Sequence, residues 1–162
     1  MGPLPKLAAL GAAAFVALVS GCGGGGGGTQ VSGPELITKG DELCRAEQQN
    51  FKQIQATPPA NASAAADQTG QLVASAQKEL DALRNLKPPG DLSSKYEAYL
   101  EAQQRALDLL EQGQKAAEQQ DGNTYGKLQK QISDGAQKRH ELARAVGFKN
   151  CSNPVAGSSA PG

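Results

Sequence analysis

Apolar and small residues recur at helical spacing in the first half of the chain. The steps of three and four residues that place side chains on one face of an α-helix run through residues 34–56 and 63–86. In the first stretch the positions are Ile37, Gly40, Cys44, Phe51 and Ile54, with Leu36 and Leu43 beside them. In the second they are Leu72, Val73, Ala76, Leu80, Leu83 and Leu86. Each stretch predicts an amphipathic helix.

The second half of the chain repeats this pattern. Residues 92–120 carry Leu92, Tyr96, Tyr99, Ala106, Leu107, Leu110 and Ala117 on one side. Residues 125–146 have a narrow, coiled-coil-like stripe of Tyr125, Leu128, Ile132, Gly135, Arg139, Leu142 and Val146. These patterns predict a third and a fourth helix.

Helix-starting and helix-ending residues lie between the stretches. Ser32 and Glu35 have the spacing of a capping box around Pro34. Two Pro-Pro pairs, at 58–59 and 88–89, interrupt the chain because proline lacks the amide hydrogen that a helix needs. Asp91 is expected to cap the third helix, 121–123 to close it, and Gly147 to end the fourth.

The predicted fold is therefore all-α, an antiparallel four-helix bundle. Short connections favour antiparallel neighbours, and the four apolar stripes can converge on one core. The expected domain covers residues 34–151. Residues 22–33, with six consecutive glycines, form a flexible tether, since glycine loses the most backbone entropy on ordering. Residues 152–162 are mostly small, include two prolines and are expected to be a disordered tail.

Residues 1–21 have the features of a secretory signal peptide. One lysine, Lys6, precedes the apolar run 7–19, and the small residues Ser20 and Gly21 follow it. A helix that crosses a bilayer needs about 20 apolar residues, and this run is shorter. The pattern predicts a cleavable signal rather than a permanent membrane span.

The end of that signal, Leu18-Val19-Ser20-Gly21-Cys22, resembles the lipobox of bacterial lipoproteins. The resemblance covers the first 22 residues. It implies cleavage before Cys22, a diacylglyceryl thioether on its sulfur, and a lipid-anchored position on the extracytoplasmic face of the cell membrane. Two or more acyl chains hold a protein stably on a membrane. The alternative is a secreted protein in which Cys22 is incidental.

Cys44 and Cys151 remain as an even pair. Disulfides form in oxidising compartments outside the cytoplasm. In an up-down-up-down bundle the first helix leaves the end to which the fourth returns, so the two residues can meet. The sequence predicts a Cys44–Cys151 disulfide, with two free thiols as the alternative. The layout also resembles small helical lipoproteins of actinobacteria, in its early and late cysteines, its Pro-Pro breaks and the Tyr-x-x-Tyr-Leu segment at 96–100.

Charge and composition exclude some partners. Without Lys6 the mature chain keeps 15 of its 16 basic residues against 16 acidic ones, a net charge of −1. A nearly neutral chain with mixed signs is not expected to bind nucleic acid. The chain has no Trp and only three each of Phe and Tyr. Its core must therefore come mainly from Leu, Ala, Val and Ile.

No residue pattern predicts catalysis, a metal or a cofactor. His140 is the single histidine, and Met1 is the single methionine and leaves with the signal. The glycine run lacks the Gly-Lys-Ser/Thr ending of a phosphate loop. Arg139 on an apolar stripe is unusual. Its stem can cover the core edge while its head reaches water or a Glu, or it can contact an anionic ligand or partner. Tyr96, Tyr99 and Tyr125 can pack in the core or form a partner-binding patch.

The function expected from these features is a membrane-anchored, non-enzymatic interaction or structural module of the cell envelope. Its partner would be another envelope protein or a cell-wall polymer. A small-ligand-binding lipoprotein is the alternative, which requires a cavity of several hundred Å³ between helices, lined by Leu and Tyr. An enzyme would require a cleft with clustered polar groups of perturbed pKa.

Overall fold

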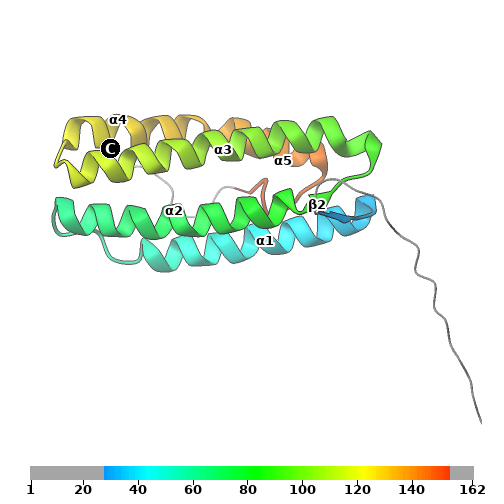
Figure 1. The fold of residues 1–162 in the computed structure, drawn as a ribbon, viewed down its shortest axis with the longest axis horizontal. Helices are drawn as coiled ribbons and strands as arrows, with labels where there is room; N and C mark the ends of the chain where they lie inside the picture. The colour runs from blue at the N-terminus through cyan, green and yellow to red at the C-terminus, as the bar shows by residue number, and fades with distance from the viewer. Residues whose placement is uncertain (1–27, 154–162) are drawn as a thin grey trace, which may run out of the picture.

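The computed structural model describes residues 28–153, and the chain there is predominantly helical, as the apolar pattern predicts. The helices lie side by side along the long axis of the molecule (Figure 1). The elements in chain order are β1 (Thr29–Gln30), α1 (Gly33–Ile54), α2 (Ala62–Arg84), β2 (Leu86–Lys87), α3 (Gly90–Glu118), α4 (Gly122–Asp134) and α5 (Ala136–Val146).

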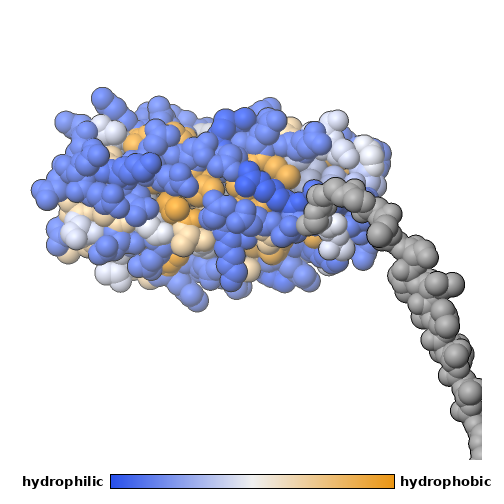
Figure 2. Space-filling model, viewed as in Figure 1, coloured by the Kyte–Doolittle hydropathy of each residue, from blue (hydrophilic) through white to orange (hydrophobic). Residues whose placement is uncertain are grey.

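Helix packing follows the order of the chain. α1 packs against α2, α2 against α3, and α3 against both α4 and α5. Figure 2 shows polar side chains over most of one face, with apolar side chains exposed in the band where the helices meet. Among the helices between residues 28 and 153, none combines the length and the apolar character needed to cross a bilayer.

Side-chain caps fix several helix ends. The Ser32–Glu35 capping box is confirmed, with the Ser32 amide donating to Glu35 Oε2 at 3.0 Å. Asn61 caps α2, and Asp121 caps α4 by accepting from the Thr124 amide at 3.0 Å. Asp91 does not cap α3 as expected. The helix begins at Gly90, before Asp91, so Asp91 lies in its first turn. A negative charge there interacts favourably with the helix dipole.

The expected fourth helix is divided into α4 and α5 by a break at Gly135. Glycine is a weak helix former. The Arg139 guanidinium lies against this glycine and donates to the Ile132 carbonyl at 3.2 Å. A β-carbon at position 135 would come within 3.1 Å of Arg139 Nη1, so the missing side chain leaves the space that the guanidinium occupies.

A short parallel pairing precedes the first helix. β1 pairs with β2, with Thr29 opposite Leu86. The Thr29 and Val31 amides donate to the carbonyls of Asn85 and Lys87 at 2.7 and 3.0 Å. Lys87 precedes a proline, which favours an extended backbone there. The glycine-rich stretch 22–33 is expected to be a flexible tether, but Thr29 and Gln30 pair with β2, Val31 is buried and Gly33 begins α1.

The main apolar core lies at the end of the molecule where β1 and β2 meet. Every helix except α4 contributes to it, together with the segment after α5. Its residues are Val31, Leu36, Cys44, Leu83, Leu86, Tyr96, Tyr99, Ala143, Val146, Phe148 and Cys151. The other end buries the leucines Leu107, Leu110 and Leu128 together with the small residues Ala116 and Ala117.

Candidate functional site

The disulfide predicted from the sequence is confirmed. Cys44 of α1 and Cys151, which follows α5, are bonded, with Cα atoms 5.2 Å apart. Both residues are buried. This excludes the alternative of two free thiols in the structure described here.

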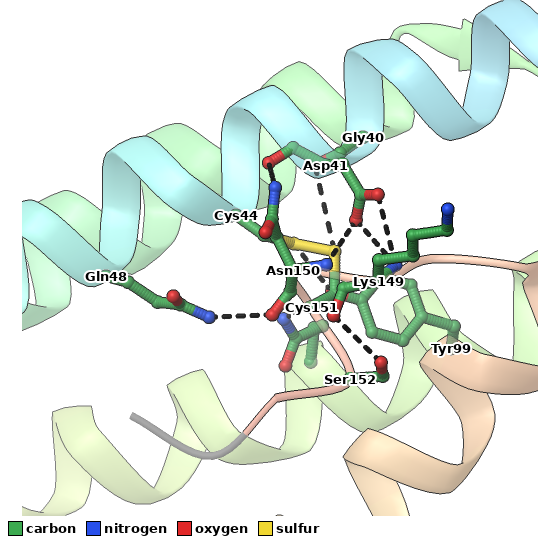
Figure 3. The surroundings of a disulfide bond; sticks show 10 residues. Gly40, Asp41, Cys44, Gln48, Tyr99, Lys149, Asn150, Cys151 and Ser152 are labelled. Carbon is green, nitrogen blue, oxygen red and sulfur yellow. Dashed lines mark hydrogen bonds between the residues drawn. A yellow bond between two sulfur atoms is a disulfide. The ribbon is translucent and has the colours of Figure 1, made fainter. Parts of the chain in front are cut away.

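Residues 147–152 form a segment that we call the C-terminal clasp, and polar contacts hold it on α1 beside the disulfide (Figure 3). The Asp41 carboxylate accepts from the backbone amides of Lys149 and Asn150 at 2.9 and 2.7 Å. The Asn150 side chain donates to the Asp41 carbonyl at 3.1 Å, and Gln48 Nε2 donates to the Asn150 carbonyl at 2.8 Å. The cysteine is therefore one of several attachments along two turns of α1.

Phe148 supplies the apolar part of the clasp. Gly147 ends α5 with φ +108°, the left-handed conformation that glycine adopts readily at a helix end, and this turns the chain toward α1. The Phe148 ring lies against Gly40, where any side chain would overlap it. It also meets Tyr96 and Tyr99 edge-on, with ring centroids 6.2 and 5.4 Å away. The apolar stripe includes Gly40, but no pattern in the sequence indicates Phe148 as its partner.

The three tyrosines do not form one cluster. Tyr96 and Tyr99 are core residues of α3, whereas Tyr125 lies in α4, where its hydroxyl is 3.3 Å from Thr69 Oγ1. The Tyr96 hydroxyl donates to the Leu83 carbonyl at 2.7 Å. The Tyr99 hydroxyl accepts from Gln103 at 2.9 Å and lies 3.4 Å from Cys44 Sγ. Burial raises the pKa of both core tyrosines, so their hydroxyls remain protonated hydrogen-bonding groups.

Polar side chains occupy core positions in the middle of the molecule, one turn from the disulfide. Glu47 falls on the α1 stripe between Cys44 and Phe51, and Glu79 falls on the α2 stripe between Ala76 and Leu83. Gln103 and Arg139 occupy stripe positions on α3 and α5. We call these four residues the polar layer. The apolar pattern singled out only Arg139, although the same three- and four-residue steps pass through Glu47 and Glu79.

The two glutamates of the polar layer meet across α1 and α2. Glu79 is 7 % exposed and Glu47 is half-buried, and each carboxyl group acts on the pKa of the other. Burial raises the pKa of Glu79 well above its usual range, and the Glu47 carboxyl raises it further. Burial also raises the pKa of Glu47, while the hydrogen bond from Glu79 and the charge of Arg139 act in the opposite direction. Burial therefore favours the protonated form of Glu79.

Arg139 differs in part from what was expected, because its head hydrogen-bonds a backbone carbonyl. The side chain is half-buried, and its guanidinium binds the Ile132 carbonyl at the α4–α5 break. Its charge also acts on Glu47. The neighbouring His140 is half-buried, and partial burial together with the charges of Arg139 and Arg144 lowers its pKa. His140 is thus neutral at pH 7.

The surface hollows do not fit the pocket expected of a small-ligand carrier. One of about 450 Å³ lies against α2 and α3 and is lined by Arg84, Glu97, Leu100, Glu101, Gln104 and Arg105. Another, of about 300 Å³, is lined mainly by polar groups that include Asp67, Gln114 and Glu118. Neither has a lining of Leu and Tyr. Within residues 28–153, no three His, Cys, Asp or Glu side chains gather so that they could hold a metal ion.

Several residues of the predicted site lie outside the described part of the chain. They are the signal peptide 1–21, Cys22 with the first glycines of the tether, and residues 154–162 of the tail. Ser152, which was assigned to the tail, is buried and donates to the Lys149 carbonyl at 2.9 Å. No protein-family model, curated protein or solved structure matches the chain.

Proposed function

We propose that this chain is a bacterial lipoprotein, anchored through Cys22 to the extracytoplasmic face of the cell membrane, whose helical domain is a non-enzymatic interaction or structural module of the envelope. The observation that carries the proposal is the sequence Leu18-Val19-Ser20-Gly21-Cys22 at the end of a short apolar run. The buried disulfide supports it, because such bonds persist in oxidising compartments outside the cytoplasm.

The position of β1 supports an anchor close to the domain. Only the six glycines 23–28 separate Cys22 from Thr29, the first paired residue. At about 3.3–3.6 Å per residue, six residues span roughly 20 Å at most. A lipidated Cys22 would therefore keep the end with β1 and β2 next to the membrane, and the opposite end, with the α1–α2 and α3–α4 connections, would face outward.

We further propose that the fold is an antiparallel four-helix bundle in which α4 and α5 together form the fourth rod. The contacts of α3 with both segments support this arrangement, as does the single-residue break between them. The closely packed core and the polar surface suit a module that contacts another envelope protein or a cell-wall polymer through its exterior.

Substitution of the anchoring residue tests the proposed localisation. The Cys22→Ser variant should remain as uncleaved precursor and take up no fatty-acid label in a bacterial host, because the thioether needs the sulfur. Metabolic labelling and membrane fractionation measure this. Ser20→Ala is the matched control: it keeps a small residue before the cleavage site and should be labelled and cleaved normally. Normal processing of Cys22→Ser would exclude the lipoprotein assignment.

Crosslinking in intact cells tests the proposed role. The anchored protein, crosslinked at its surface lysines, should give discrete larger species, identified by mass spectrometry as an envelope protein or as cell-wall material. Recovery of the protein as a monomer alone, at crosslinker levels that trap known envelope complexes, would argue against an interaction module.

A further inference from the structure

The Glu47–Glu79 contact lacks the donors that normally accompany buried carboxylates. No N–H or O–H group in the described structure lies within hydrogen-bonding distance of Glu79 Oε1. Arg139 acts on the pair through its charge, but its guanidinium hydrogen bond goes to the Ile132 carbonyl. Among residues 28–153, no ion pair within 4.0 Å includes either glutamate. An unpaired buried carboxylate is costly, and two adjacent ones repel each other.

A single shared proton resolves this conflict. When Glu79 is protonated, its O–H can donate to the Glu47 carboxylate, and the negative charge is left on the half-buried member that faces Arg139. The other titratable groups acting on the pair are Tyr96 and Tyr99 of α3, which hold their own protons. The proton is therefore the donor that links α1 to α2 at this level.

We propose that Glu47 and Glu79 share one proton and form a pH-dependent latch between α1 and α2, which holds the last eight residues of α1 (47–54) while the proton is present and releases them when the proton passes to water. Loss of the proton places two negative charges in contact across the helix pair. The repulsion favours separation of residues 47–54 of α1 from α2.

The clasp limits the separation of α1 from α2 to residues 47–54. Up to Gln48, the helix is fixed by Asp41, the disulfide and the Gln48 hydrogen bond. The buried residues of α1 are Leu36, Gly40 and Cys44, all of which precede Glu47. Beyond Gln48, Phe51 and Ile54 are only half-buried. Apart from the hydrogen bonds of Gln68 to the Ile54 and Thr57 carbonyls, at 2.7 and 2.9 Å, this segment is held by fewer buried side chains than the segment before it.

The direction of the pH effect follows from the pKa of Glu79. Its pKa is raised in the folded protein, so the closed form binds a proton that the open form releases. The latch is fully effective below the ordinary pKa of a glutamate, about 4.3. It weakens as the pH rises toward the raised pKa of Glu79, and the open-to-closed ratio changes up to about tenfold per pH unit for one proton.

Hydrogen–deuterium exchange of the mature, oxidised protein between pH 5 and 9 tests the latch. After correction for intrinsic exchange, protection of residues 47–54 should fall by up to about tenfold per pH unit within the range where the shared proton is lost. Residues 36–44 should stay protected. In Glu79→Gln the amide donates to Glu47 at every pH, so its profile should be flat, with more protection than the wild type at the alkaline end.

The exposed Glu97→Gln on α3 is the matched control and should follow the wild-type profile. A flat wild-type profile, an equal slope in Glu79→Gln, or parallel loss of protection in residues 36–44 would each overturn the proposal. Carboxyl ¹³C titration of the wild-type protein gives a second readout that needs no variant. One glutamate should titrate well above the ordinary range, and its absence would also overturn the latch.

Discussion

At the scale of single residues, Gly40 shows how a missing side chain decides packing. It lies in the middle of α1, where glycine costs helix stability, and the Phe148 ring occupies the space that a β-carbon would fill. Gly40→Ala should therefore destabilise the fold by about 1–3 kcal/mol, the usual cost of overpacking a filled core. The midpoint of urea unfolding, followed by circular dichroism, measures this.

Gly126 of α4 is the matched control for Gly40. Like Gly40 it lies within a helix, but it is exposed, and a β-carbon there would meet nothing within 4 Å. Gly126→Ala should raise stability by about 0.5–1 kcal/mol through helix propensity alone. If both substitutions raised the unfolding midpoint, the close approach of Phe148 to Gly40 would not hold in solution.

Contacts could be predicted from the sequence where the residue type itself indicates them. Contacts that depend on which distant segments pack together could not. The Cys44–Cys151 bond followed from an even pair of cysteines and the direction of the helices. The Asp41 and Phe148 contacts join positions more than 100 residues apart, and nothing local in either sequence indicates them. The burial of Glu47 and Glu79 could have been predicted, because both acidic residues fall at positions of the apolar stripes, which face the core.

At the scale of elements, the apolar patterns predicted that a stretch is helical more accurately than they predicted where each helix begins and ends. Periodic apolar residues identify a helix because burial of one face stabilises it, so α1, α2 and α3 lie where expected. β1 escaped notice because its stability comes from β2, more than 50 residues away, rather than from its own sequence. The break at Gly135 involves a local contact, since the guanidinium of Arg139, four residues later, lies against it, but the apolar stripe runs through both residues without interruption.

Burial of Val31 beside β1 gives a prediction for the start of the domain. Val31 is 4 % exposed and belongs to the main core. Val31→Ala should lower the free energy of unfolding by about 1–2 kcal/mol, because two buried methyl groups are lost. Thr29→Ala, at an exposed position whose pairing uses only the backbone amide, should change it little. If both substitutions had equally small effects on thermal unfolding, residues 29–32 would be part of the tether and not of the folded domain.

At the scale of the whole molecule, the clasp joins the last described residues to the first helix. The apolar core, the disulfide and the Asp41 contacts all lie in the half of the molecule that also contains β1 and β2. The opposite half is held by buried leucines, by small residues and by the Thr69–Tyr125 hydroxyl contact. The covalent bond and the clasp therefore fix α1 only as far as Gln48.

Removal of the disulfide should lower the stability of the domain without changing its helical structure. Cys44 and Cys151 are 107 residues apart, and closing so long a loop contributes up to about 4–5 kcal/mol in the chain-entropy model. The double variant Cys44→Ala/Cys151→Ala avoids leaving a single thiol. It should keep the native helical signal, because Phe148 and Asp41 still hold the clasp.

The double variant should also lose about 2–5 kcal/mol of stability and unfold with a steeper dependence on urea, since an unlinked chain exposes more surface. Urea titrations of the oxidised protein and the double variant give both quantities. Adding Asp41→Asn to the double variant should then cost a further 1 kcal/mol or so, because the clasp amides lose a charged acceptor. Loss of helix in the double variant alone would mean that the covalent bond, rather than the packing around it, holds the clasp on α1.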